Sequence, residues 1–324
     1  MQTVQGMGHG LGGKTARQAM AGSGFGPWQR LGVVLSIVLL TACSSMPSSK
    51  TQESGVTPTA ERREVRLGLA LGGGAARGFA HVGVIQVLEE AGLKPSHVVG
   101  TSAGSLVAAL YASGKTPVEL VRVAESMQEA EITDWMLPIL NRGALRGEAL
   151  AKYVNTQVGG KTLEQMPMAL GIVATDLGSG QAITFRRGNT GAAVRASSAV
   201  PAVFQPVRLG DREYVDGGLV SPVPVRQTRE MGANFVIAVD ISSDPEGNPY
   251  GDTFQILMQT FAIMGKSINT LALKEADLVI RPALSGVKSA DFSARLRAIE
   301  AGRAAMRAAL PTLKARMAQF EEGR

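Results

Sequence analysis

The 324-residue sequence predicts one α/β domain, in which a mostly parallel central sheet lies between two layers of helices. Short apolar runs alternate with segments of helical spacing along most of the chain. Several of these runs, such as Phe235 to Val239, are apolar on both faces, as in parallel strands that are covered on both sides. Aromatic residues make up only 5% of the chain, against 39 glycines, and this composition favours closely packed α/β layers over a β-sandwich.

The expected elements alternate in chain order within a single domain over 64–324. Strands are predicted over 65–71, 97–100, 170–175, 182–186, 213–215, 235–239 and 278–281. Helices are predicted over 79–91, 103–113, 117–127, 147–158, 189–200, 224–231 and 252–275. The segment 132–145 is irregular and apolar, and we interpret it as a lid or a pocket wall.

A terminal helix is predicted over 292–320. Its apolar side chains fall on roughly one face: Leu296, Ile299, Met306, Leu310, Leu313, Met317 and Phe320. We expect this face to dock on the core, and a helix lying on a membrane surface is the alternative. Pro311 is expected to kink or divide the helix.

Residues 1–42 have the features of a secretory leader. Arg30 precedes an apolar run, Leu31 to Leu40, that is too short to span a hydrocarbon core of ~30 Å comfortably. Leu40-Thr41-Ala42-Cys43 resembles a bacterial lipoprotein box, which implies cleavage before Cys43 and attachment of lipid to it. The alternative is a lone buried cysteine in a membrane helix.

The expected location is the bacterial outer membrane, with the domain facing the periplasm. Ser44 follows the cysteine, and this resembles the bacterial sorting pattern for that membrane. Residues 43–63, rich in Ser, Pro, Thr and charge, are expected to form a flexible tether. The leader is long, so translation could begin at Met1 or at Met20.

The charge of the chain gives no case for a nucleic-acid partner. The formal net charge is +6, but Lys14, Arg17 and Arg30 of the leader supply three of these charges, which leaves +3 for the remainder. Cys43 is the one cysteine, so no intrachain disulfide can form. No metal-ligand cluster or cofactor motif is visible, and neither is expected.

Gly100-Thr101-Ser102-Ala103-Gly104 has the G-x-S-x-G pattern of a nucleophile elbow. Val98-Val99 precede it as a strand end, and a small-residue helix follows. In such a turn the glycines let strand and helix approach closely, while the N–H groups of the helix face the oxygen on which charge develops. Ser102 is therefore the candidate nucleophile.

A second glycine-rich turn, Gly72-Gly73-Gly74-Ala75-Ala76-Arg77-Gly78, follows the first predicted strand. It could cradle a phosphate as in dinucleotide-binding folds, but Ala75 and Arg77 interrupt the G-x-G-x-x-G pattern. No acidic residue clearly ends a strand about 20 positions later. Exposed backbone N–H groups in this turn could instead bind an oxyanion.

The base that would activate Ser102 is expected to be a carboxylate. Of the three histidines, His9 lies in the leader. His97 begins the strand that leads to the elbow, and at ~3.3 Å per residue along that strand it lies far from Ser102. His81 lies one helical turn past the glycine loop, where a packing or capping role is favoured. Three aspartates stand where strands are predicted to end: Asp176, Asp216 and Asp240.

These motifs together resemble the patatin-like phospholipases, and specifically the bacterial branch related to neuropathy target esterase. The resemblance covers about residues 65–283. It rests on Gly72 to Gly78 with Arg77, the elbow from Gly100 to Gly104, the stretch from Arg195 to Val207, and Asp216-Gly217-Gly218, all in family order. It implies a three-layer α/β/α fold and a Ser–Asp dyad, with Ser102 as nucleophile and Asp216 as base.

The resemblance also implies an oxyanion hole at Gly72, Gly73, Gly74 and Ala75, centred on the amides of Gly73 and Gly74. Many family members carry a further glycine where this chain has Ala75, which keeps its N–H. The implied activity is hydrolysis of phospholipids or lysophospholipids in a membrane. An esterase or thioesterase for soluble acyl substrates and a non-catalytic acyl-binding lipoprotein remain alternatives at this stage.

Overall fold

The computed structural model describes residues 63–134, 143–248, 250–288 and 291–323. The predicted leader, Cys43 and most of the tether lie outside these residues, as do residues 135–142 of the predicted lid or pocket wall.

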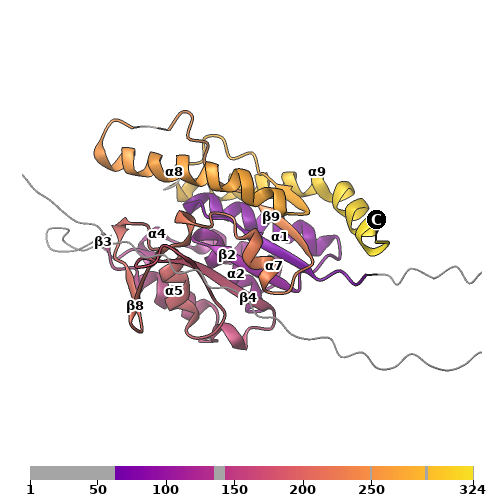
Figure 1. The fold of residues 1–324 in the computed structure, drawn as a ribbon, viewed down its shortest axis with the longest axis horizontal. Helices are drawn as coiled ribbons and strands as arrows, with labels where there is room; N and C mark the ends of the chain where they lie inside the picture. The colour runs from indigo at the N-terminus through magenta and orange to yellow at the C-terminus, as the bar shows by residue number, and fades with distance from the viewer. Residues whose placement is uncertain (1–62, 135–142, 249, 289–290, 324) are drawn as a thin grey trace, which may run out of the picture. The chain divides into compact units, whose positions relative to one another are not determined.

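The main sheet has the strand order β10-β9-β1-β2-β4-β8-β7, and β5 pairs with β4 (Figure 1). All neighbours from β10 to β4 are parallel, whereas β5 and β8 are antiparallel to β4 and β7 is antiparallel to β8. The strands are β1 (Leu67–Leu71), β2 (His97–Thr101), β4 (Ala169–Asp176), β5 (Ala182–Phe185), β7 (Val207–Leu209), β8 (Arg212–Asp216), β9 (Phe235–Val239) and β10 (Leu278–Ile280). The mostly parallel sheet predicted from the sequence is confirmed.

Helices cover both faces of this sheet. The α-helices are α1 (Phe79–Glu90), α2 (Ala103–Ala112), α3 (Pro117–Ser126), α4 (Glu129–Ile132), α5 (Glu148–Gln157), α6 (Thr190–Ser197), α7 (Val225–Glu230), α8 (Thr253–Ala272) and α9 (Arg295–Glu321). Short 3-10 helices are η1 (Ala75–Gly78), η3 (Leu163–Gln165), η4 (Gly217–Leu219), η5 (Leu273–Glu275) and η6 (Phe292–Ala294).

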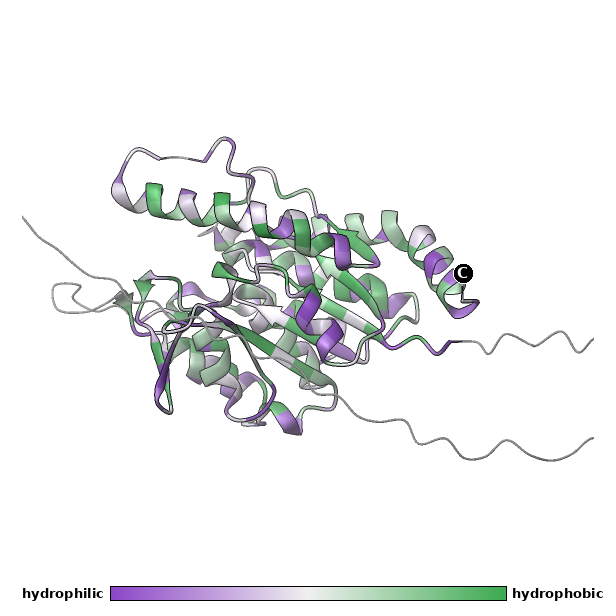
Figure 2. Cartoon of the chain, viewed as in Figure 1, coloured by the Kyte–Doolittle hydropathy of each residue, from purple (hydrophilic) through white to green (hydrophobic). Residues whose placement is uncertain are grey.

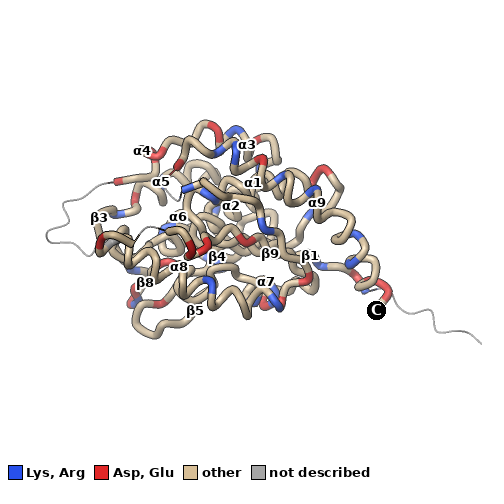
Figure 3. Tube along the Cα trace, turned by 90° about the horizontal axis from the view of Figure 1, so that it is seen from above, with Lys and Arg blue, Asp and Glu red and all other residues tan. Residues whose placement is uncertain are grey.

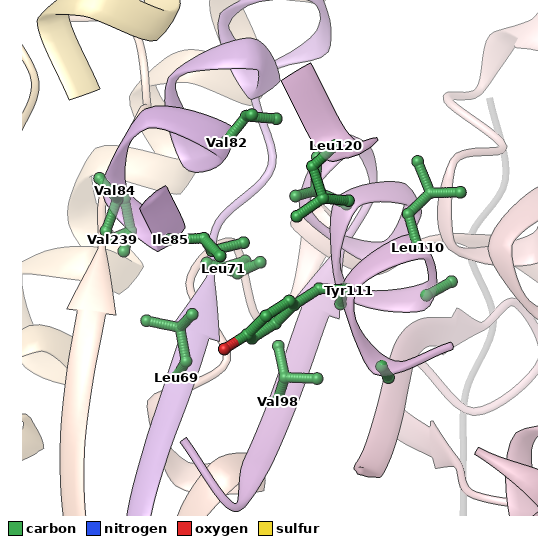
Figure 4. Packing of buried hydrophobic residues seen from close by; sticks show 14 of the residues in the cluster. Leu69, Leu71, Val82, Val84, Ile85, Val98, Leu110, Tyr111, Leu120 and Val239 are labelled. Atoms are coloured by element: carbon green, nitrogen blue, oxygen red, sulfur yellow. The ribbon is translucent and has the colours of Figure 1, made fainter. Parts of the chain in front are cut away.

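The strands are buried on both faces, which explains their continuous apolar sequences. In β9, Phe235, Ile237 and Val239 join the larger core beneath α1 and α9, while Val236 and Ala238 join a smaller core beneath α7. Side chains alternate between the faces of a strand, so one apolar run supplies both layers. Figure 4 shows the larger core, where Leu69, Leu71 and Val98 of the sheet face Ile85 and Tyr111 of the helices.

Helix α9 docks on α1, as the sequence predicted. Ile299, Met306 and Leu313 are buried in the larger core. Pro311 does not divide the helix, which continues through it, and the prediction that Leu296 lies on the docked face was wrong, because Leu296 is exposed. Lys and Arg are interspersed with Asp and Glu along the described chain (Figure 3).

Three short strands were not predicted. Two of them, β3 (Gly143–Leu145) and β6 (Ala202–Phe204), pair in a small parallel sheet, and the third, β7, is an edge strand of the main sheet. Each has only three residues, which is too short for side-chain alternation to be recognised in a sequence. The predicted helix 252–275 is an α-helix to Ala272 and continues as the 3-10 helix η5.

Candidate active site

The pairing of β4 brings Ser102 and Asp216 together. Strand β2 ends with Thr101 beside Val173, while β8, running the other way, ends with Asp216 beside Ala174. Strand β5 pairs with residues 172–175 of β4, which overlap both the segment paired with β2 and the segment paired with β8. Strands β2 and β8 therefore both lie on the other edge of β4, where their ends face each other. Residues 114 positions apart in sequence are therefore adjacent in space.

Ser102 occupies a strained turn between β2 and α2. Its φ of 52° and ψ of −124° are rare for a residue with a side chain. The close approach around it requires glycine, since a Cβ on Gly100 would lie 2.3 Å from the Gly104 carbonyl oxygen, and one on Gly104 would lie 2.2 Å from that of Leu71. The turn directs the serine side chain away from the strand and toward β8.

The Ser102 hydroxyl donates a hydrogen bond of 2.7 Å to Oδ2 of Asp216. The other carboxylate oxygen, Oδ1, accepts from the Gly218 N–H at 2.6 Å. A Cβ on Gly217 would lie 2.2 Å from the Val173 carbonyl oxygen, so the Asp-Gly-Gly sequence lets this turn pack directly against β4. Both oxygens of the carboxylate are thus fixed.

Burial raises the pKa of the Asp216 carboxyl to about 6, against the opposing effect of the hydrogen bonds from Ser102 and Gly218. A carboxyl in water has a pKa of about 4 and accepts protons poorly at neutral pH. The raised pKa makes Asp216 a stronger base while leaving most of it ionised at pH 7.

Ser197, at the end of α6, supports the turn and was not singled out from the sequence. Its Oγ accepts a hydrogen bond of 2.8 Å from the Ser102 N–H and donates one of 2.5 Å to the Val173 carbonyl. Ser197 lies inside the stretch from Arg195 to Val207 that carries the family resemblance, which was the available signal.

The glycine loop lies beside the serine. Leu71 is paired with Gly100, so the loop leaves β1 level with the elbow. A Cβ on Gly73 would lie 3.2 Å from that of Ser102, and one on Gly78 would lie 2.8 Å from that of Ala103. The loop is therefore close enough to the serine to act on a group bound there.

Hydrogen bonds change the predicted set of oxyanion donors. The Gly72 N–H donates to the Val239 carbonyl at 3.0 Å, and the Gly73 N–H donates to the Pro222 carbonyl at 2.9 Å. These two amides are thus engaged in holding the loop, contrary to the prediction. Within the described residues, the N–H groups of Gly74 and Ala75 have no hydrogen-bond partner. Ala75 has a φ of 51°, a conformation for which glycine is better suited.

The other candidate bases have different partners. The His81 Nε2 lies 2.8 Å from the Gly72 carbonyl oxygen. Burial lowers the pKa of His81 to about 4, so the ring is neutral at pH 7 and donates Nε2–H to that carbonyl, supporting the glycine loop. Asp176 pairs with Arg212 at 2.7 Å, and Asp240 pairs with Arg281 at 3.2 Å. Of the three aspartates, Asp216 is the one bonded to Ser102.

Comparison with known proteins is consistent with this geometry. Residues 69–229 match the family described as patatin-like phospholipase, a range that includes both glycine-rich turns, Ser102 and Asp216. The chain carries a patatin-like phospholipase domain. The patatin-like fold is also found in VipD from Legionella pneumophila, with a TM-score of 0.53 and 16% identity, covering 78% of this chain and 68% of that one. At this identity the likeness concerns the fold alone.

Curated relatives of the patatin-like domain belong to the NTE family. An uncharacterized NTE family protein of Mycobacterium tuberculosis is 37% identical over 183 residues, which are 56% of this chain and 51% of the relative. Lysophospholipase NTE1 of Debaryomyces hansenii is 28% identical over 194 residues, 58% of this chain and 12% of the relative. This chain spans about half the length of the first curated relatives that it matches.

Proposed function

We propose that this protein is a serine acyl hydrolase that cleaves carboxylic esters of lipids, of phospholipase or lysophospholipase type. The observation that carries the proposal is the 2.7 Å hydrogen bond from the strained Ser102 to the buried Asp216. The patatin-like domain and the lysophospholipase among its relatives support a lipid ester as the substrate.

In the proposed reaction, Asp216 accepts the hydroxyl proton of Ser102 as Oγ attacks the ester carbonyl. The free N–H groups of Gly74 and Ala75 stabilise the tetrahedral oxyanion, an effect worth roughly 2.7–4 kcal/mol per donor in comparable sites. The alcohol leaves with the proton, and an acyl-serine remains. Asp216 then takes a proton from water as the water attacks the acyl group, and it gives that proton to the departing Oγ of Ser102, which releases the acid and restores the free enzyme.

Purified protein with a soluble short-chain acyl ester tests the dyad. Ser102→Ala and Asp216→Asn should each lower kcat/KM by about 10⁴-fold or more. Asp176→Asn is the matched control, because it also removes a carboxylate at a strand end but leaves the Ser102 hydrogen bond intact. Activity retained by Asp216→Asn but lost on changing Asp176 or His81 would assign the base elsewhere.

Two further measurements separate the proposal from its alternatives. A fluorophosphonate probe should label Ser102, whereas a non-catalytic acyl-binding protein would stay unmodified. A panel of phospholipids and lysophospholipids should be hydrolysed, whereas an enzyme for soluble acyl substrates would act on short esters or thioesters alone.

We also propose that residues 1–42 form a lipoprotein signal peptide and that Cys43 carries lipid after cleavage. The lipid would hold the domain at the bacterial outer membrane, facing the periplasm. The short apolar run and Leu40-Thr41-Ala42-Cys43 support this proposal. Such an anchor would keep the enzyme beside membrane lipids.

A further inference from the structure

The outer side of α8 carries large apolar side chains that none of the described residues cover. Ile256, Ile263, Met264 and Leu271 are 55%, 52%, 44% and 68% exposed, and we call these four residues the apolar stripe. Among the α8 side chains that the structure describes, Asn269 alone is buried. The helix lies along one edge of the domain in Figure 1, and Figure 2 shows hydrophobic residues along its length.

Polar contacts with residues 242–245 hold α8 against the domain. Gln259 donates to the Pro245 carbonyl at 2.8 Å, Lys266 pairs with Asp244 at 3.0 Å, and Asn269 donates to Ser242 at 2.9 Å. At 3.6 residues per turn, Asn269 lies on the side of the helix opposite to the apolar stripe, while Gln259 and Lys266 lie on a flank within one turn of Ile263. The side away from the stripe is also apolar, with Leu257, Met258 and Phe261 partly buried, so the stripe is a second apolar side that an amphipathic core helix would not have.

Helix α8 borders the candidate active site. It contacts η4, the turn that begins directly after Asp216. A Cβ on Gly265 of α8 would lie 3.7 Å from Pro222, whose carbonyl accepts the N–H of Gly73 in the glycine loop. Gly265 lies on the side of α8 away from the stripe, so the width of the helix, about 10 Å, separates a surface bound to the stripe from the glycine loop.

We propose that the apolar stripe inserts into the surface of a phospholipid bilayer and so places the dyad at the lipid–water interface. This inference rests on the proposed hydrolysis of lipid esters. Lys266 is the one charged residue in the sequence from Thr253 to Ala272, and Asp244 pairs with it, so the outer side of α8 matches an apolar and electrically neutral surface. Binding should accordingly occur on zwitterionic lipid and depend little on salt.

The dimensions and surroundings of α8 suit a helix lying in the plane of the membrane. Its 20 residues extend about 30 Å. The stretch Gln255–Glu275 could cross a membrane by length and composition alone, but the polar contacts with 242–245 hold α8 against the domain. Tyr250, 71% exposed just before the helix, has a side chain suited to the headgroup level.

The chain that precedes the domain is long enough to permit this contact. Arg63, the first described residue, follows Cys43 by 20 positions, a length of chain that could extend up to about 70 Å. A lipid on Cys43 would keep the domain near the bilayer, and the stripe would determine which side of the domain faces the lipid.

Site-directed fluorescence tests insertion in the full chain. Cys43→Ser removes the one cysteine, and Leu271→Cys or Val118→Cys then accepts an environment-sensitive fluorophore. Val118 on α3 is the matched control, because it is 57% exposed and apolar. With phosphatidylcholine vesicles, the probe at 271 should shift to the blue and be quenched by lipid-borne nitroxides, whereas the probe at 118 should do neither.

Equal responses at 271 and 118 would overturn the proposal. A blue shift at 271 that grows with protein concentration in the absence of vesicles would also overturn it, since a second copy of the chain would then cover the stripe. Each probe reports its own position, so attachment of vesicles through residues 1–62 does not imitate insertion of α8.

Assays of hydrolysis on vesicle lipid and on a soluble ester test the membrane contact of α8 separately from the proposed function. The double variant Ile263→Ser, Leu271→Ser should lose about tenfold or more of its hydrolysis of vesicle phospholipid, because two apolar side chains no longer transfer into lipid. Its hydrolysis of a soluble short-chain ester should be unchanged, as should both activities of Val118→Ser. If the wild type hydrolyses no lipid, the proposed substrate is wrong, while the fluorescence at 271 still decides whether the stripe inserts.

Discussion

At the residue scale, Asp216 combines burial with a short hydrogen bond to Ser102. A carboxylate in water would be too weak a base for this role, and a fully desolvated one would be protonated at neutral pH. Burial raises its pKa to about 6, a value between these limits. The pH dependence of the reaction is therefore a direct test of which group is the base.

The first prediction concerns the pH profile. Hydrolysis of a soluble ester requires ionised Asp216, so kcat/KM should rise with pH, with an apparent pKa of about 6, and become constant above about pH 7. Steady-state kinetics between pH 4 and 9 measure this. Activity that stayed constant down to about pH 4 would contradict it and would direct attention to His81, whose pKa burial lowers to about 4.

The second prediction concerns stability. The pKa of Asp216 is higher in the folded state than in the unfolded chain, so its favourable contribution is complete below about pH 4 and is lost as the pH rises through 6. Asp216→Asn should therefore increase the free energy of unfolding at pH 8, by up to roughly 3 kcal/mol, and change it little near pH 4. Urea unfolding of both proteins at the two pH values measures the difference.

Asp176→Asn should behave in the opposite way. The hydrogen bond from Arg212, followed by the Ser179 N–H, lowers the pKa of Asp176. Its contribution to stability is present above the unfolded pKa and is lost as the pH falls, so this variant should be less stable than the wild type at pH 8. The same sign for both variants would show that burial does not govern Asp216.

At the element scale, α1 and α9 approach each other through two glycines. A Cβ on Gly83 would lie 2.0 Å from the Ile299 carbonyl oxygen, and one on Gly302 would lie 2.0 Å from that of Ala80. Such contacts exclude any side chain. This approach lets α9 bury Ile299, Met306 and Leu313 against the layer beneath it.

The third prediction follows from this contact. Gly302→Ala should reduce the free energy of unfolding by about 3 kcal/mol or more, because the backbones of α1 and α9 must separate. Gly265→Ala in α8 is the matched control: its Cβ would meet only Pro222, at 3.7 Å, and replacing an unconstrained helical glycine by alanine stabilises by about 1 kcal/mol. Urea unfolding measures both. Equal effects of the two substitutions would mean that α1 and α9 do not touch at these glycines.

At the scale of the whole molecule, the sequence predicted the fold through its long regular parts. Strands such as 235–239 and helices such as 79–91 can be recognised from their pattern of apolar residues and from the glycines near their ends. The register of β4, which brings Ser102 to Asp216, depends on pairing between distant segments and has no local signal. The hydrogen bonds of Ser197 and of the Gly72 and Gly73 N–H groups could not be predicted for the same reason, because their partners are distant in sequence.

Helix α8 illustrates a different limit. Its sequence is apolar enough to be assigned to a core, but the structure leaves Ile256, Ile263 and Leu271 mostly exposed. Periodicity identifies the helix and does not determine which side faces the domain. Polar partners such as Asp244 and Ser242, in the loop that precedes the helix, hold it in place.

The fourth prediction separates the proposed lipid anchor from the catalytic domain. An alkyne analogue of palmitate should label the wild-type protein in bacterial cells, and the protein should fractionate with membranes. Cys43→Ser should abolish the labelling, because no other cysteine is present to carry the lipid. Hydrolysis of a soluble ester by this variant should be unchanged, since Cys43 precedes the first described residue of the domain by 20 positions. Labelling that survives the substitution, or wild-type protein that stays unlabelled, would refute the anchor and leave the dyad as a separate question. Loss of ester hydrolysis in the variant would instead mean that the segment around Cys43 contributes to the folded domain.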